Sequence, residues 1–114
     1  MPRRQLLLSG YRGMWLFAIF DLPVTTAKAR KRYAQFRKVL LEQGFSMLQY
    51  SVYARYCASE EMSDAYRSRI RSELPPEGYV RVLAVTDRQF GKMESYIGEM
   101  SKPLEEPPSQ LVLF

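Results

Sequence analysis

A seven-residue apolar run that ends in an aspartate is the feature that most constrains the fold of this chain. Residues 14–20 read MWLFAIF, and Asp21, Leu22 and Pro23 follow directly. An unbroken run rich in aromatic and aliphatic side chains is typical of a strand that is buried on both faces. Because proline cannot continue a central strand, the run predicts a central strand that ends beside Asp21.

The segment after this strand has the pattern of an amphipathic helix. Thr25 or Thr26 can cap its N-terminus, and Gly44 can end it. Between residues 27 and 43, apolar side chains recur at helical spacing, and basic side chains occupy much of the remainder. The apolar set is Ala29, Tyr33, Phe36 and Leu40, and the basic set is Lys28, Arg30, Lys31, Arg32, Arg37 and Lys38.

The second half of the chain predicts further strands and a second helix. Residues 45–57 are rich in β-forming side chains but long for one strand, so we expect two strands or a bulge near residues 49–51. Ser59 can cap a helix. Residues 78–87 alternate as a strand does, whereas residues 88–98 show no clear pattern. The inner face of the second helix is expected to carry Met62, Tyr66 and Ile70, with Leu74 at its end.

The resulting order, β-α-β-β-α-β, is typical of the α+β ferredoxin-like sandwich, in which two helices cover one face of an antiparallel sheet. The chain itself would leave the other face uncovered. Since the first strand is apolar on both faces, we expect a homodimer that packs sheet on sheet. Residues 1–100 are expected to form this domain, and residues 101–114 a Pro-rich C-terminal arm with a terminal strand.

The arm ends in four apolar residues, which are Leu111, Val112, Leu113 and Phe114. Exposed to water, such a segment would favour aggregation. We therefore expect it to pair with a sheet edge of its own chain or of a partner, and so to bind that partner. The alternative is a frayed terminus.

The composition excludes several kinds of catalytic site. The chain has no histidine and one cysteine, Cys57, which rules out Ser-His-Asp and Cys-His arrangements, a zinc cluster and an intrachain disulfide. Any catalysis must use carboxylates, Tyr, Lys or a hard metal ion. The N-terminal stretch lacks both a cleavage site and the roughly 20 unbroken apolar residues of a membrane span. We therefore expect a cytoplasmic protein with no membrane partner.

The charge favours a nucleic-acid partner. The formal net charge is +5, and the chain holds 12 arginines, whose planar guanidinium suits phosphate. In the first helix, Arg30 with Arg37 and Lys31 with Lys38 repeat at seven-residue spacing, which keeps each pair on one face and can match phosphates along a duplex. The alternative is a solvated helix face. Arg12 and Arg55 are further candidates for DNA contacts.

The tyrosines are expected to be mainly structural. Tyr33 and Tyr66 fall on the inner stripes of the two predicted helices. Tyr50 and Tyr53 could lie near a dimer axis or pack in the sheet, and we favour packing.

Asp21 has two readings from the residues alone. It could cap the turn before the first helix by accepting from backbone N–H groups near Val24 and Thr25. In a two-fold dimer, both copies could instead approach the axis, where two carboxylates repel unless a cation or proton sits between them. A Mg²⁺ ion suits carboxylate ligands and can polarise a phosphoryl oxygen or lower the pKa of bound water.

Four linked stretches resemble the CRISPR-associated protein 2 family, in the variant found beside single-subunit RNA-guided effector nucleases. They are Asp21-Leu22 after the first strand, Phe36-Arg37-Lys38 in the basic helix, Gly44-Phe45, and QYSVY at residues 49–53. The resemblance covers about residues 14–85. It implies a ferredoxin-like homodimer that acts with the CRISPR adaptation integrase, two dimers of which flank it. The resemblance implies that this complex captures short DNA duplexes and inserts them as new spacers.

The resemblance also implies a role for Asp21, because some relatives are magnesium-dependent nucleases on RNA or double-stranded DNA in which the matching aspartate is the metal ligand. We therefore expect a non-sequence-specific DNA-binding structural subunit that bridges integrase dimers and holds the duplex prespacer. The alternative is a magnesium-dependent endonuclease that uses the paired Asp21 of a homodimer. An RNA-cutting toxin and a small-molecule-binding domain of the same fold are further alternatives.

Overall fold

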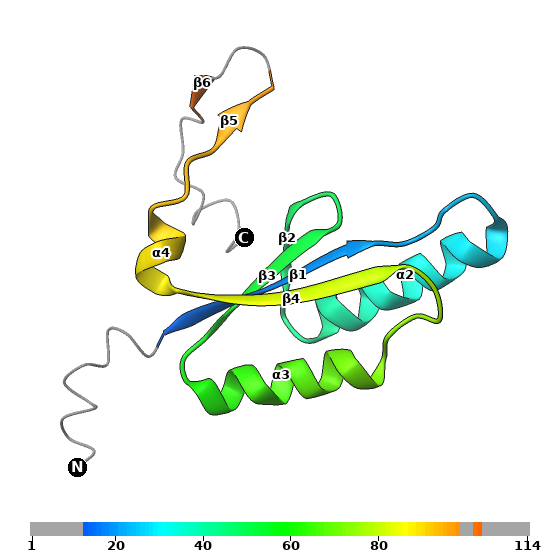
Figure 1. Cartoon of the computed structure of the whole chain (residues 1–114), viewed down its shortest axis with the longest axis horizontal. Helices are drawn as coiled ribbons and strands as arrows, with labels where there is room; N and C mark the ends of the chain where they lie inside the picture. Colours follow the sequence, from blue (N-terminus) through cyan, green and yellow to red (C-terminus); the bar gives the residue numbers. More distant parts are fainter. Residues whose placement is uncertain (1–12, 99–101, 104–114) are drawn as a thin grey trace.

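The computed structural model describes residues 13–98 and residues 102–103, and Figure 1 shows a sheet with two long helices on one side. Arg12 and residues 111–114 lie outside the described residues. The sheet consists of β1 (Met14–Asp21), β2 (Ser46–Gln49), β3 (Val52–Cys57) and β4 (Tyr79–Thr86). The two long helices are α2 (Ala27–Glu42) and α3 (Glu60–Ser72). Beyond β4 come α4 (Asp87–Gly91), β5 (Tyr96–Ile97) and β6 (Lys102–Pro103).

The strand order confirms the predicted ferredoxin-like fold. The four strands lie in the order β2-β3-β1-β4, and every neighbouring pair is antiparallel. The apolar strand β1 therefore has a partner on each side, as its composition predicted. The expected break near residues 49–51 is a tight turn at Tyr50 and Ser51, where Ser51 has a φ of 63°.

The predicted capping residues set the helix boundaries. The hydroxyl of Thr26 accepts from Ala29 N at 3.0 Å and begins α2. Gly44, at a φ of 87°, lets the chain leave that helix. The hydroxyl of Ser59 accepts from Met62 N at 3.2 Å and begins α3.

The main core lies between the sheet and the two long helices. Alternate residues of β1 point toward the helices. They pack on the apolar stripe of α2, where Phe36 meets the ring of Phe20 edge-on at 5.2 Å. The buried members of this core are Leu16, Ala18, Phe20, Leu22, Phe36, Leu40, Phe45, Tyr53, Cys57 and Ile70.

The predicted inner face of α3 is wrong at its start. Met62 is 36% exposed, and Ser63 is buried in its place. Because Ser63 and Ile70 are seven residues apart, they share a face, whereas Met62 lies about 100° round the helix from Ser63. Leu74, expected at the end of this stripe, is also exposed.

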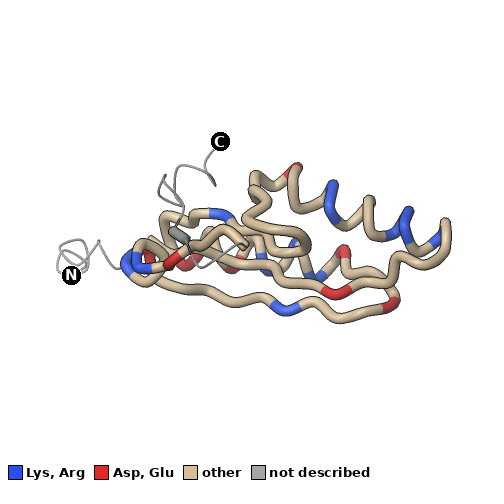
Figure 2. Tube along the Cα trace, turned by 90° about the horizontal axis from the view of Figure 1, so that it is seen from above, with Lys and Arg blue, Asp and Glu red and all other residues tan. Residues whose placement is uncertain are grey.

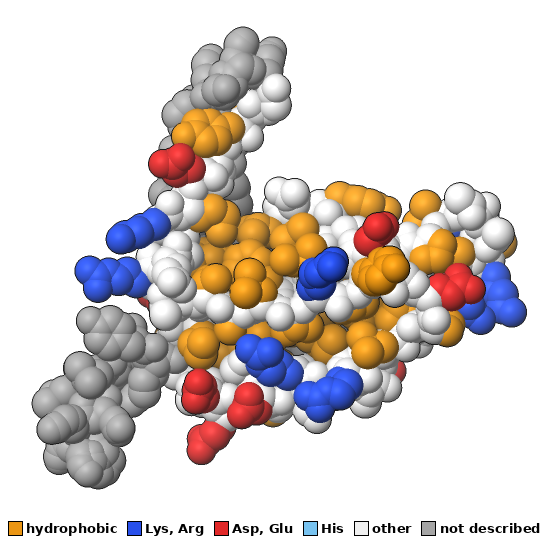
Figure 3. All heavy atoms as spheres, viewed as in Figure 1, with side chains coloured by type: hydrophobic (Ala, Val, Ile, Leu, Met, Phe, Trp, Pro, Cys, Tyr) orange, Lys and Arg blue, Asp and Glu red, His pale blue; other side chains and the backbone are white. Residues whose placement is uncertain are grey.

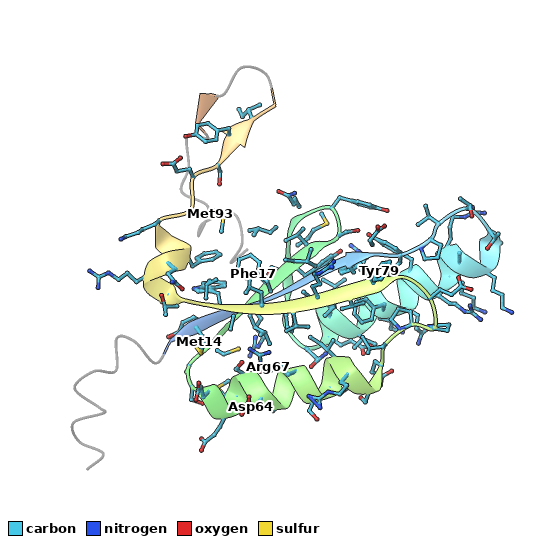
Figure 4. All side chains as sticks on the ribbon, viewed as in Figure 1. Met14, Phe17, Asp64, Arg67, Tyr79 and Met93 are labelled. Carbon is cyan, nitrogen blue, oxygen red and sulfur yellow. The ribbon has the colours of Figure 1, made fainter. Side chains whose placement is uncertain are left out.

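The short helix α4 covers part of the opposite face of the sheet, which corrects the expectation that the chain leaves this face bare. Phe90 stacks on Trp15 with ring centroids 4.0 Å apart, and Trp15 Nε1 donates to Asp87 Oδ1 at 2.8 Å. In Figure 4, Phe17 and Met93 lie at this end of the sheet. Farther along, Ile19 and Leu83 remain exposed, and Figure 3 shows hydrophobic side chains gathered beside β4.

Gly78, the residue before β4, lets the chain pass close to the end of β1. Its φ is 93°, and a Cβ there would lie 2.6 Å from the backbone oxygen of Asp21. We expect Gly78→Ala to lower the free energy of unfolding by about 1–3 kcal/mol, because it combines left-handed strain with a backbone clash. Chemical denaturation measures this loss.

The matched control is Gly91→Ala, since a Cβ at Gly91 meets nothing within 4 Å. This variant should unfold within about 0.5 kcal/mol of the wild type. Equal stability of Gly78→Ala and the wild type would contradict the strain assigned to this turn.

Candidate nucleic-acid interface and Asp21

Asp21 lies at the end of β1 on the face of the sheet that α2 and α3 leave open. Asp21 follows Phe17 and Ile19 at two-residue spacing, so all three side chains lie on the same face of the strand. The side chain of Asp21 is exposed. Among the described residues, no hydrogen bond or ion pair joins its carboxylate to another group, and the cap of α2 is Thr26. The turn-cap reading of Asp21 is therefore not supported.

A single copy of the chain offers too few ligands for a metal site at Asp21. Within residues 13–98 and 102–103, no group of three or more His, Cys, Asp or Glu side chains could hold a metal ion. One exposed carboxylate can still contribute to a site that a second copy or a substrate oxygen completes. The single carboxylate of Asp21 therefore fits a hard cation that is bound between two copies of the chain, and it does not fit a metal site built by one chain.

Two exposed tyrosines flank the end of β1. Tyr79 on β4 is the register partner of Asp21 and is 70% exposed. On the other side, Phe20 N donates to Ser51 O at 3.1 Å, which places the β2–β3 turn beside β1. Tyr50 in that turn is 69% exposed, so the expectation that it packs in the sheet is wrong.

Side chains of α2 hold the β2–β3 turn and β3 against the helix. Tyr33 stacks on Tyr50 with ring centroids 5.7 Å apart, and its hydroxyl lies 2.9 Å from Ser51 Oγ. Arg37 Nε donates to the hydroxyl of the buried Tyr53 at 2.7 Å. Hydrogen bonding with Tyr33 raises the pKa of the Tyr50 phenol above its usual range.

The basic residues of α2 form two exposed rows. Figure 2 shows the positions of Lys and Arg along the helix in blue. Members of each row are seven residues apart, so they are separated by about 10 Å along the axis. Lys31 and Lys38 lie opposite the buried stripe, and Arg30 and Arg37 lie on the side of Tyr33. The helix contains one acid, Glu42, in its last position. We call these four basic residues the α2 rows.

A shallow groove extends this basic surface toward α3. It encloses about 350 Å³ between α2 and the segment after α3. Lys31 and Arg32 line one side, and Glu73 and Leu74 line the other. Glu73 Oε2 lies 3.6 Å from Arg69 Nε, so its charge is partly neutralised there.

Arg55 lies apart from the α2 rows. It is on the helix-facing side of β3, where its guanidinium carbon stands 4.5 Å from the centroid of the Tyr66 ring. A Cβ at Gly44 would collide with Arg55 Nη1, so the glycine makes room for this side chain. These contacts give Arg55 a packing role, and its contact with nucleic acid stays a prediction.

Cys57 is a buried structural thiol. It is fully buried in the main core, and burial raises its pKa, which the nearby Arg55 and Arg67 offset only in part. Because a thiolate is the reactive form, this environment makes Cys57 a poor nucleophile.

Most of the chain matches one protein family. A family model described as CRISPR associated protein Cas2 matches residues 14–93, which include the four-stranded sheet, the helices α2, α3 and α4, and Asp21. The chain belongs to the Cas2 family. The predicted resemblance is thereby confirmed.

Three Cas2 relatives are similar over most of the chain, and each is named CRISPR-associated endoribonuclease Cas2. The protein from Parvibaculum lavamentivorans is 52% identical over 101 residues, which cover 89% of this chain and 100% of the relative. The protein from Flavobacterium psychrophilum is 46% identical over 107 residues, covering 94% and 93%. The protein from Paracidovorax avenae is 40% identical over 108 residues, covering 95% and 100%.

The described part of this Cas2-family chain contains no helix that is both long enough and apolar enough to cross a membrane.

Proposed function

We propose that this Cas2-family chain is a non-sequence-specific DNA-binding subunit of the CRISPR adaptation complex, in the cytoplasm. The observation that carries this proposal is the pair of exposed α2 rows, on a helix with six basic residues and one acid. The positive charges of the α2 rows suit the phosphates of a nucleic-acid backbone. Phosphates are the same in every sequence, so such contacts do not depend on sequence. Such contacts suit a protein that holds varied prespacer duplexes between integrase dimers.

A homodimer is part of this proposal. Ile19 and Leu83 are exposed on the open face of the sheet beside Asp21. Packing this face against a second copy would bury apolar surface, which is favourable by about 25 cal/mol per Å². The dimer would also present the α2 rows twice and give a duplex four rows of cations.

The experiment for this function is titration of the purified protein with random-sequence DNA duplexes at several salt concentrations. We expect similar affinity for unrelated sequences and a steep loss of affinity as salt rises, because phosphate contacts release counterions. Strong preference for one sequence, or binding that is insensitive to salt, would contradict the proposal.

A magnesium-dependent endonuclease on RNA or double-stranded DNA is the second candidate. The name endoribonuclease of the relatives supports it, together with the exposed carboxylate of Asp21. In a sheet-on-sheet dimer, Asp21 of both protomers would hold the ion. Bound Mg²⁺ would supply Lewis-acid polarisation of a phosphoryl oxygen or a water of lowered pKa. The protein's own part is to set two carboxylates on rigid strand ends, and the test is cleavage with and without magnesium.

A further inference from the structure

Tyr53 is a core tyrosine whose hydroxyl is not explained by packing. Its side chain is 1% exposed, and its ring stacks on Phe20 with centroids 5.7 Å apart and 24° between the ring planes. A phenylalanine would fill the same space and would need no polar partner. Within the described part of the chain, the hydroxyl accepts one hydrogen bond, from Arg37 Nε at 2.7 Å. We therefore look to Arg37 for the role of this hydroxyl.

The hydrogen bond joins a rigid strand to an exposed side chain. Tyr53 lies in β3 and is the register partner of Ala18 in the central strand β1, so the sheet sets its position. Arg37 is an exposed residue of α2. A distance of 2.7 Å is short for a nitrogen donor, as expected where the donor carries a charge. The sheet thus fixes the direction of a cation that stands in solvent.

The rest of the Arg37 guanidinium can bind a ligand. The bond to Tyr53 uses the N–H on Nε and leaves those on Nη1 and Nη2. Within residues 13–98 and 102–103, no carboxylate lies within ion-pair distance of Arg37. The two Nη atoms form a planar fork, which matches two oxygens of one phosphate.

Arg30, about 10 Å away along the same row of α2, is held in a similar way. Its Nη1 donates to the backbone oxygen of Val24 at 3.1 Å. The other row consists of Lys31 and Lys38, and a lysine is a point charge on a flexible stem. The arginine row is therefore the part of the α2 rows that is preorganised for phosphate.

We propose that Tyr53 is a positioning residue for DNA binding, whose buried hydroxyl aims the Nη1–Nη2 edge of Arg37 at a backbone phosphate. The inference rests on the proposed function, because it requires that phosphates bind the α2 rows. A free arginine loses rotamer freedom when it binds, whereas an arginine held by Tyr53 has lost much of that freedom during folding. Tyr53 itself touches no nucleic acid, since its side chain is buried.

The test measures the affinity of the full chain for a fluorescent random-sequence duplex by anisotropy at several salt concentrations. Tyr53→Phe should weaken binding by a dimer about 5-fold or more, because two long side chains must then be ordered on binding. The slope of log affinity against log salt should not change, because no charge is removed. Arg37→Lys, at an exposed helix position that suits lysine, should show a similar loss at an unchanged slope.

A double-variant cycle separates positioning from a purely structural role of Tyr53. Arg37→Gln should weaken binding and lower the salt slope by about 2 for a dimer, because it removes two cations. Adding Tyr53→Phe to Arg37→Gln should cost no further affinity, because the hydroxyl no longer has a cation to aim. A full further loss in the double variant would overturn the proposal, since Tyr53 would then act on the fold and not through Arg37.

Tyr33→Phe is the matched control, because it removes a hydroxyl that lies 2.9 Å from Ser51 Oγ and is not the acceptor of Arg37. It should bind the duplex like the wild type.

A second readout needs no DNA. NMR of the arginine side chains should show slow exchange of the Arg37 Nε–H with water in the wild type and fast exchange in Tyr53→Phe. Equal exchange in the two proteins would overturn the proposal.

The outcome for this inference is distinguishable from that for the proposed function. If the wild type binds the duplex with a steep salt dependence and Tyr53→Phe binds equally well, the positioning role fails and the DNA-binding function stands. If the wild type does not bind the duplex, the DNA-binding function fails. Slow exchange of the Arg37 Nε–H would then identify the bond to Tyr53 as a packing contact, and the positioning role would fail as well.

Discussion

Replacing Arg30, Lys31 and Lys38 together by glutamine will weaken binding of duplex DNA about 100-fold or more near physiological salt. A dimer loses six cations from the α2 rows, and loss of six phosphate contacts should reduce the slope of log affinity against log salt by about 5. Glutamine is a good helix former, so α2 should persist. Arg37 is left in place because it also donates to Tyr53. Fluorescence anisotropy at several salt concentrations gives both quantities.

A control for this variant removes the same charge from other surfaces. Arg71, Arg88 and Lys92 are exposed and lie outside α2, so their joint replacement by glutamine tests net charge alone. This control should lose much less affinity and keep most of the salt slope. Equal losses in the two variants would show that DNA responds to overall charge and that α2 is not the binding surface.

Asp21→Asn is expected to abolish magnesium-dependent cleavage of RNA or double-stranded DNA, with a loss of at least about 100-fold. Asparagine keeps the size of the side chain but removes both negative charges from a dimer, and with them the attraction for a hard cation. Since the carboxylate has no hydrogen bond within the described part of the chain, the midpoint of thermal unfolding should stay close to that of the wild type. Gel assays with and without magnesium measure the cleavage.

Asp64→Asn serves as the matched control for cleavage. Asp64 is an exposed carboxylate on α3, on the other side of the sheet from the open face, and Figure 4 shows its position. Asp64→Asn should cleave like the wild type. If Asp21→Asn keeps full activity, the cleavage belongs to another site or to a contaminant.

Local sequence patterns were sufficient to predict most of the fold. The run from Met14 to Phe20 could only be stable in the centre of the sheet, and Thr26, Gly44 and Ser59 carry capping chemistry that depends on a few neighbouring residues. The α2 rows were equally predictable, because helical periodicity alone separates their face from the buried stripe.

The helix α4, which the sequence analysis did not predict, begins with a recognisable capping pattern. Thr86 and Gln89 form a capping box, in which the Thr86 hydroxyl accepts from Gln89 N at 3.0 Å and Gln89 Oε1 accepts from Thr86 N at 2.9 Å. The spacing of Thr and Gln by three residues is a sequence signature of a helix start. Its five residues are too short for apolar periodicity, so capping was the one usable pattern.

The surroundings of Asp21 could not be predicted from local patterns. Tyr79 lies beside Asp21 only because β1 and β4 pair in one register across 58 residues of chain. Tyr50 is exposed because of the backbone turn at Ser51, where a residue other than glycine adopts a positive φ. Both facts depend on tertiary pairing, which composition and spacing do not specify.

Spacer acquisition in cells tests the central claim most directly, with the triple α2 variant, its charge control and Asp21→Asn measured side by side at equal protein levels. If this chain serves adaptation by holding duplex DNA on α2, the triple variant should acquire no new spacers, while the charge control and Asp21→Asn should still acquire them. Acquisition at wild-type frequency by the triple variant would contradict the account. Loss of acquisition in Asp21→Asn with an intact dimer would instead make the carboxylate the essential group.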